Sequence, residues 1–175
     1  FRQQKEGAFA SWAWTMAGLL YIGWLMSYFV ALRGLDNGRD WVFFALFTTF
    51  GSDTAAFFVG RALGRHRLAP SISPVKTWEG AIAGVFGAII ISLLFTLLIP
   101  LSYGQAIFLG VLVSAFGQLG DLVESLLKRN MGVKDSSKLI PGHGGVLDRM
   151  DSIVFAGVAV YYCVLLYNAG WLNWL

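Results

Sequence analysis

The sequence has little cysteine, little histidine and little charge. Its one cysteine, Cys163, cannot form a disulfide within the chain, and with only His66 and His143 beside it a zinc site is disfavoured. Charged residues make up 13% of the 175 residues and hydrophobic residues 57%. So few polar side chains cannot cover the surface of a water-soluble domain of this size. The composition therefore predicts a membrane protein.

A strongly basic character is also absent. The net charge is only +3, so we expect no nucleic acid partner. The first apolar segment is not followed by a small-residue cleavage site, so we expect no signal peptide. Neither an internal repeat nor a long linker is visible, and we expect residues 1–175 to form one membrane-embedded domain.

What the sequence does have is apolar runs long enough to cross a bilayer, which takes about 20 residues in a helix. The fourth run is short, but its helical pattern continues past Gly120, so we expect this helix to extend out of the bilayer. The runs predict an all-α bundle of about five transmembrane spans, at residues 10–32, 41–63, 81–99, 105–120 and 153–174.

The distribution of basic residues predicts how this bundle is oriented. Lys and Arg concentrate in cytoplasmic loops. If the five spans alternate in direction, every basic residue except Arg33 and Arg39 falls on one side. We therefore expect a cytoplasmic amino terminus, an external carboxyl terminus and two cytoplasmic polar loops in a cell (inner or plasma) membrane protein.

Small residues recur four positions apart, as Gly60 with Gly64 and Gly80 with Gly84. This spacing lets helices approach closely, either within one bundle or across a dimer interface. We expect ordinary packing within the bundle.

The second polar loop, residues 117–152, carries five acidic and five basic residues. Carboxylates for a cation and basic groups for phosphates together indicate a metal-phosphate site. Asp121, Glu124, Ser125 and Lys128 share one helix face, while Leu122 and Leu126 are expected to pack on the other. For Glu124 and Lys128 an ordinary pair on a solvated face is the alternative. A carboxylate at the end of an apolar span is costly unless it is paired or binds a metal, and for Asp121 we expect a metal.

Farther along this loop, the glycine-rich segment 141–145 could bring several backbone N–H groups to a phosphate, or could be an ordinary turn. His143 within it could act as an acid or base, although a structural or phosphate-binding role is favoured. Asp148 and Asp151 follow at the start of the last span, where one carboxylate, but hardly two, is explained by the helix N-terminus.

Two segments resemble a known signature. Residues 125–151 read SLLKRNMGVKDSSKLIPGHGGVLDRMD, and the first polar loop holds GSDTAAF at 51–57 and SISPVKTWEG at 71–80. Both resemble motifs of the phosphatidate cytidylyltransferase (CDP-diacylglycerol synthase) family, with Val75 where the family usually has Lys. The resemblance runs from about Asp53 to the end of the chain. Because bacterial members carry further N-terminal spans, we expect the chain to be the C-terminal catalytic portion.

The resemblance implies a Mg2+-dependent transfer of the cytidylyl group of CTP to phosphatidic acid at a membrane-embedded funnel, by a homodimer. A second cation is left open. It also implies that Asp121 and Asp148 are metal ligands, and we add Asp151 to them. The expected catalytic residues are Asp121, Lys128, Arg129, Lys134, His143, Asp148, Arg149 and Asp151. The expected substrate-binding residues are Asp53, Ser73, Lys76, Thr77, Glu124, Ser125, Gly142, Gly144 and Gly145.

Other functions stay open at this point. CTP-dependent polyprenol or phytol kinases and CDP-archaeol synthases are neighbouring enzymes. An ion-coupled transporter would account for Asp53 inside a span, although an ion pair between Asp53 and Arg61 would satisfy that carboxylate too. An inactive fragment is the remaining alternative.

Overall fold

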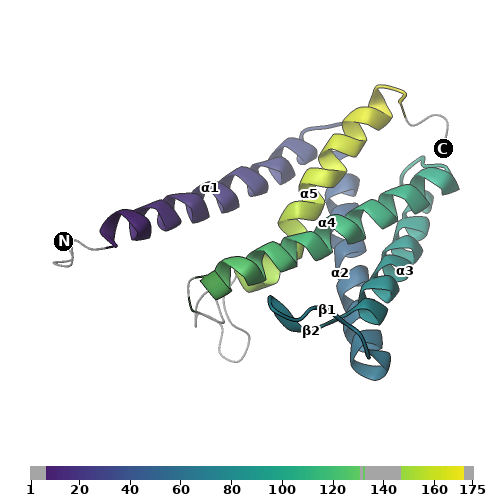
Figure 1. The fold of residues 1–175 in the computed structure, drawn as a ribbon. Coiled ribbons are helices and arrows are strands. Elements are labelled where there is room, and N and C mark those ends of the chain that lie inside the picture. Colours follow the sequence, from purple (N-terminus) through teal and green to yellow (C-terminus); the bar gives the residue numbers. More distant parts are fainter. Residues whose placement is uncertain (1–6, 131, 133–146, 172–175) are drawn as a thin grey trace.

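The computed structural model describes residues 7–130, 132 and 147–171. Five long helices dominate the fold (Figure 1), and each is long and apolar enough to cross a bilayer, so the predicted all-α bundle of five spans is confirmed. The helices are α1 Ala8–Arg33, α2 Gly38–Leu63, α3 Trp78–Leu94, α4 Tyr103–Asn130 and α5 Leu147–Asn168, with a short 3-10 turn, η1 Phe95–Leu97, after α3.

One element was not predicted. The first polar loop contains an antiparallel hairpin of β1 Arg67–Ala69 and β2 Ser73–Thr77. Its register places Arg67 opposite Thr77, directly before α3 begins. The hairpin therefore returns the chain from the end of α2 to the start of α3 across residues 64–77.

Contacts between distant segments show which helix ends lie together. At one end of the bundle, the ring of Tyr167 in α5 lies 6.0 Å from that of Trp41 in α2, and its hydroxyl donates to the Pro100 carbonyl at 2.8 Å. At the other end, Arg129 Nε of α4 donates to the Ile72 carbonyl of the hairpin at 3.4 Å. The hairpin and the charged end of α4 thus share one end of the bundle, as the charge distribution predicted.

The two halves of the bundle differ in polarity. The main apolar core lies in the half away from the hairpin and includes Trp41, Phe44, Phe95, Leu109 and Val160. The half near the hairpin instead buries polar side chains, beginning with the hydroxyls of Ser52 and Ser114, which lie 2.8 Å apart between α2 and α4. The chain is therefore packed by apolar contacts at one end and left free for polar chemistry at the other.

Helices α2 and α3 approach each other through glycine. A Cβ built on Gly80 would lie 2.8 Å from the Ala56 carbonyl oxygen, and one built on Gly87 would lie 2.7 Å from the Gly51 carbonyl oxygen. A Cβ on Gly84 would lie 3.1 Å from the Ser52 hydroxyl. The small residues therefore serve packing within the bundle, as expected.

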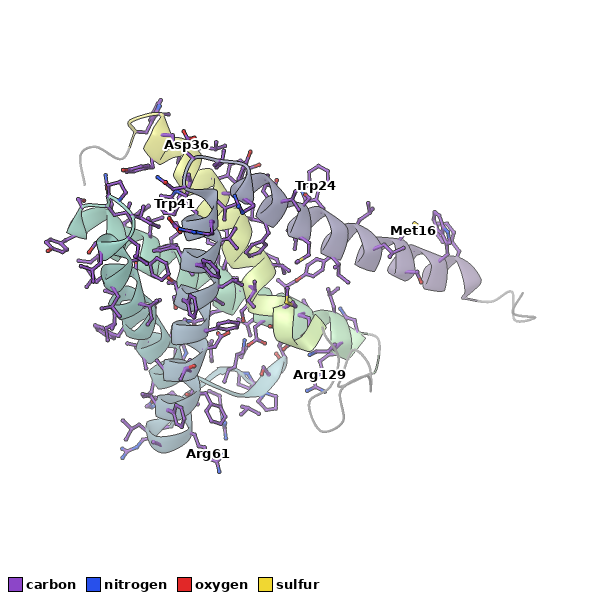
Figure 2. All side chains as sticks on the ribbon, turned by 180° about the vertical axis from the view of Figure 1, so that it is seen from behind. Met16, Trp24, Asp36, Trp41, Arg61 and Arg129 are labelled. Atoms are coloured by element: carbon purple, nitrogen blue, oxygen red, sulfur yellow. The ribbon has the colours of Figure 1, made fainter. Side chains whose placement is uncertain are left out.

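The outer surface suits a lipid environment. Large apolar side chains such as Phe47, Phe58 and Phe86 are more than half exposed. Helix α1 extends away from the bundle at its amino end (Figure 1), and its Met16 and Trp24 side chains project from the ribbon (Figure 2). So much exposed apolar surface is expected of a membrane protein and not of a soluble one.

Candidate functional site

Charged side chains from four elements gather in the polar half of the bundle. Asp53 comes from α2, Lys76 from β2, Asp121 from α4 and Asp151 from α5. Asp53 lies about 15 Å, or ten residues, before the end of α2, and Asp121 about 14 Å before the end of α4. The site is therefore set back from the helix ends, between the spans.

The closest contact across the site joins the two polar loops. Lys76 Nζ lies 2.6 Å from Asp121 Oδ2, with 22% of the lysine side chain and 33% of the aspartate side chain exposed. The lysine nitrogen itself is closed off from solvent. The Ser125 hydroxyl, one turn after Asp121, donates to Oδ1 of the same carboxylate at 3.4 Å. Asp121 is thus held from both sides.

Asp53 and Asp151 complete the acidic side of the site. Each carboxylate interacts electrostatically with Asp121 and with Lys76, and Asp53 also interacts with the Ser152 hydroxyl. The Asp53 side chain remains accessible although it lies among α2, α4 and α5. The cation that serves Asp53 is Lys76, and the predicted alternative partner Arg61 forms no ion pair within the described part of the chain.

The pair of Glu124 and Lys128 corrects a prediction. Lys128 Nζ lies 2.5 Å from Glu124 Oε2, but Glu124 is only 1% exposed and Lys128 18%. The interpretation as a solvated helix face is therefore wrong. The expectation that Leu126 packs on the opposite face is wrong as well, since Leu126 is 43% exposed. Helix α4 turns Glu124 into the bundle, where its ammonium partner lies, and turns Leu126 outward.

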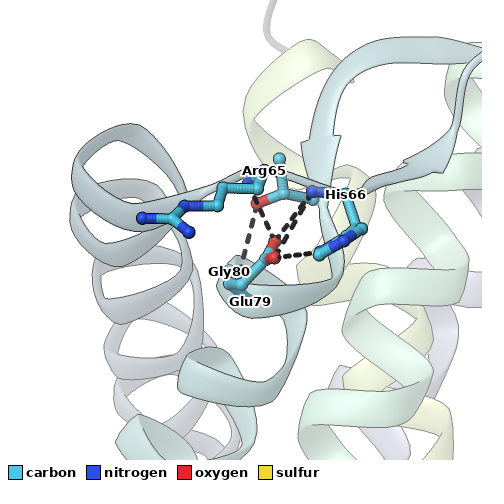
Figure 3. Close-up of polar contacts among 5 residues, drawn as sticks. Arg65, His66, Glu79 and Gly80 are labelled. Carbon is cyan, nitrogen blue, oxygen red and sulfur yellow. Dashed lines mark hydrogen bonds and ion pairs between the residues drawn. The ribbon is translucent and has the colours of Figure 1, made fainter.

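Lys76 reaches the site because the hairpin is fastened at its base. Glu79 in the first turn of α3 accepts hydrogen bonds from the backbone N–H groups of Arg65 at 3.2 Å and His66 at 3.3 Å. His66 Nδ1 lies 2.6 Å from Glu79 Oε1 (Figure 3). Thr77 ends β2 and caps α3 by accepting from Gly80 N–H at 3.2 Å. Lys76, immediately before this cap, is positioned by both.

The structure brings together many of the predicted residues. Asp53, Lys76, Asp121, Glu124, Ser125, Lys128 and Asp151 all belong to the cluster. Arg129 instead contacts the hairpin, and Thr77 is 5% exposed with its hydroxyl used as a helix cap. Ser73 begins β2 opposite Ala69.

Several predicted residues lie outside the part of the chain that the structure describes. Lys134, Gly142, His143, Gly144 and Gly145 fall in residues 133–146. Asp148 and Arg149 lie within the bounds of α5, but their side chains are not among those described. The roles expected for these seven residues stay predictions.

Sequence reasoning missed three contributors to the site. Ser152 is 3% exposed and interacts with Asp53. Glu79 and His66 hold the hairpin, and of these only Glu79 had a signal, since it lies in the motif at 71–80. A serine beside an aspartate at a helix start is too common a pattern to indicate a site.

The donor set of the cluster suits a hard cation. Among the described residues, no three side chains of Asp, Glu, His or Cys are already arranged to bind one metal ion. The cluster does contain four carboxylates, of Asp53, Asp121, Glu124 and Asp151, against the two ammonium groups of Lys76 and Lys128. Carboxylate oxygens and an excess of negative charge fit Mg2+ rather than a metal that prefers nitrogen or sulfur.

The chain is similar to known bacterial proteins. A sequence profile described as the cytidylyltransferase family matches residues 1–167. Phosphatidate cytidylyltransferase of Bacillus subtilis is 42% identical over 152 residues, which cover 85% of this chain and 56% of that protein. The protein of the same name from Brucella suis is 44% identical over 150 residues, with the same two coverages of 85% and 56%.

An uncharacterized Escherichia coli protein, YnbB, is 40% identical over 165 residues, or 94% of this chain and 55% of that protein. The chain spans about half the length of these curated relatives. The matched stretch includes both polar loops that supply the charged cluster.

Proposed function

Because the chain belongs to the cytidylyltransferase family, we propose that it forms the catalytic portion of a phosphatidate cytidylyltransferase. The reaction transfers the cytidylyl group of CTP to phosphatidate, giving CDP-diacylglycerol and pyrophosphate. The observation that carries the proposal is the contact between Lys76 and Asp121 at 2.6 Å. It joins the two loops that carry the family motifs into one charged site inside an apolar bundle.

The chemistry needs positioning and charge compensation more than it needs a reactive side chain. An oxygen of the lipid phosphate attacks the α-phosphorus of CTP and forms the new P–O bond. The bond from the α-phosphorus to the oxygen bridging to the β-phosphorus breaks, and pyrophosphate leaves with that electron pair. The attacking oxygen needs little deprotonation, since the second pKa of a phosphate monoester is about 6. A protein nucleophile is therefore not required.

The cations of the cluster have the task of compensating phosphate charge. Lys76 and Lys128 enter the site from β2 and α4, and each is oriented by a carboxylate, Asp121 or Glu124. An ammonium group held in place before substrate binds needs little reorganisation in the transition state. Arg129, Lys134 and Arg149 are the further cations expected to contact the triphosphate and the lipid phosphate.

Asp121 and Asp151, with Asp148 as the predicted third ligand, are the residues that would hold Mg2+. When bound, Mg2+ would neutralise phosphate oxygens and so favour attack on the α-phosphorus. Asp53 is repelled by both Asp121 and Asp151, and a divalent cation bound at this place would offset that repulsion.

The position of the site in the bundle fits a reaction between a soluble and a lipid substrate. The hairpin end carries Arg61, Arg65, Arg67, Lys76, Lys128 and Arg129, so we place it on the cytoplasmic side of the plasma membrane. CTP would enter from that end, and phosphatidate from the bilayer between the helices. A homodimer is also expected. The glycines between α2 and α3 do not supply its interface, because they pack these two helices against each other within one chain.

The activity is tested with the chain purified in detergent and supplied with Mg2+, phosphatidate and CTP labelled at the α-phosphorus. We expect label in the lipid and release of unlabelled pyrophosphate. The same assay with CTP labelled at the γ-phosphorus should leave the lipid unlabelled. Label from the γ-phosphorus in lipid would instead establish a CTP-dependent kinase. If neither labelled CTP gives labelled lipid, the proposal for this chain is overturned.

A further inference from the structure

One buried hydroxyl at the edge of the site has no hydrogen-bond partner among the described residues. Tyr21 lies in the middle of α1, and its Oη is closed off from solvent with no hydrogen bond to any group that the structure describes. Buried polar groups are paired in the great majority of cases, and each exception needs an explanation. Helix α1 is otherwise the least buried of the five spans, so a densely packed core does not explain why this hydroxyl is buried.

Ring packing places Tyr21 beside the charged cluster. Its ring lies 5.9 Å from that of Phe155, which is one turn after Asp151 on α5. Phe155 in turn packs on α4, since a Cβ on Gly120 would lie 2.9 Å from the Phe155 ring, and Gly120 is one turn before Glu124. Tyr21 accordingly interacts electrostatically with the carboxylates of Asp151 and Glu124.

One oxygen of each neighbouring carboxylate is already engaged. Asp151 Oδ1 accepts a hydrogen bond from the Ser152 backbone N–H at 2.7 Å. Glu124 Oε2 lies 2.5 Å from Lys128 Nζ. The Tyr21 hydroxyl is a potential donor held next to the site, and it donates to no group in the described part of the chain.

We propose that Tyr21 is a substrate-binding residue whose hydroxyl donates a hydrogen bond to a phosphate oxygen of the bound substrate. The inference rests on the proposed function. It adds a residue of α1 to a site that the two polar loops and α5 otherwise form. Phosphate is the fitting acceptor, because a hydrogen bond to a charged oxygen is stronger than one to a neutral group and offsets the cost of burying the donor. Exposed Leu19, Leu20 and Trp24 around Tyr21 mark the lipid side, from which phosphatidate would arrive.

The alternative is a purely structural hydroxyl that donates to Asp151 or Glu124 after a small movement. The two possibilities differ in the protein without substrate. A structural hydrogen bond stabilises the free protein, whereas an unpaired buried hydroxyl does not, so removing it leaves the stability of the free protein unchanged or higher.

The test compares Tyr21→Phe with Tyr28→Phe. Tyr28 lies on the same helix, but its hydroxyl is exposed and lies 3.1 Å from that of Tyr162. We expect Tyr21→Phe to lower kcat/KM by about tenfold or more, which corresponds to the loss of one hydrogen bond to a charged group. The thermal midpoint of the substrate-free variant should be no lower than that of the parent. Tyr28→Phe should keep the parent kinetics. Separate KM values for CTP and phosphatidate show which phosphate accepts the hydrogen bond.

Substrate binding is measured independently of turnover, as the rise in thermal midpoint on adding CTP with Mg2+, or phosphatidate alone. The Tyr21→Phe variant should show a smaller rise than Tyr28→Phe with one of the two. Unchanged binding in Tyr21→Phe overturns the inference, and so does a lower midpoint of its substrate-free form. If binding falls as expected but the parent transfers no cytidylyl group, the role of Tyr21 stands and the proposed reaction fails.

Discussion

Lys76 Nζ lies 2.6 Å from Asp121 Oδ2, and this contact is the link between the hairpin and the charged end of α4. Lys76 lies in the motif at 71–80, and Asp121 lies four residues before the motif at 125–151. The ion pair shows that the two polar loops form one site and not two. It also gives the site a cation and a carboxylate that hold each other in position before substrate binds.

Replacing the acidic residues is the first test of the metal assignment. We expect Asp121→Asn and Asp151→Asn each to lower Mg2+-dependent release of pyrophosphate by about a hundredfold or more, the order found when charge stabilisation of a transition state is removed. Asp40→Asn is a matched control, because Asp40 pairs with Arg39 at the opposite end of the bundle. Turnover close to that of the parent in either site variant would contradict the assignment.

Lys76 and Asp121 should act as a unit. Lys76→Ala removes the cation that we propose to bind phosphate and leaves Asp121 without its ammonium partner, so we expect a loss of kcat/KM that overlaps with the loss in Asp121→Asn. A double-mutant cycle checks this, since groups in contact give non-additive effects. Arg67→Ala is the control, because the exposed Arg67 side chain donates to the Val75 carbonyl of the same hairpin, at 3.5 Å. Fully additive losses would show that the two side chains work separately.

The buried pair of Glu124 and Lys128 should be important for stability. Lys128→Met leaves a carboxylate that is 1% exposed without its ammonium group. We expect a cost of about 3 to 5 kcal/mol in the free energy of unfolding, measured by denaturation in mixed micelles. Glu124→Gln combined with Lys128→Met should cost less than Lys128→Met alone. Breaking the exposed pair by Arg39→Met should cost at most about 1 kcal/mol.

The hairpin should loosen when Glu79 is changed. Glu79→Ala removes the acceptor of two backbone N–H groups and of His66, so we expect faster amide hydrogen exchange at Arg65 and His66 and a lower kcat/KM through Lys76. Exchange in α5, which supplies none of the groups in these three hydrogen bonds, serves as the internal reference. Unchanged exchange at both amides would show that Glu79 does not hold the hairpin.

The close approach of α2 and α3 predicts opposite effects for two glycines. In Gly80→Ala the new Cβ would lie 2.8 Å from the Ala56 carbonyl oxygen, which forces the helices apart at a cost of about 1 to 3 kcal/mol. In Gly23→Ala the new Cβ meets nothing within 4 Å, and alanine favours the helix by up to about 1 kcal/mol. Thermal unfolding in detergent should thus separate the two variants in opposite directions.

Much of the architecture was predictable from the residues alone. The five spans follow from hydrophobic runs, because a helix in lipid must be apolar over a fixed length. The extension of α4 past Gly120 follows from a periodicity that persists after the apolar run ends. The gathering of basic residues at the hairpin end follows from their positions in the polar segments between the apolar runs. These are local properties of the chain, and neighbouring residues decide them.

The sequence by itself therefore determined the spans, the polar loops and the identity of most charged groups in the site. Only the tertiary structure decided that Glu124 is buried, that Lys76 pairs with Asp121, and that the hydroxyl of Tyr21 lies beside the cluster. A helical pattern places Glu124 and Asp121 on one face but does not say what covers that face. The cover comes from α1, the hairpin and α5, and packing between segments so distant in the chain leaves no trace in the local pattern of residues.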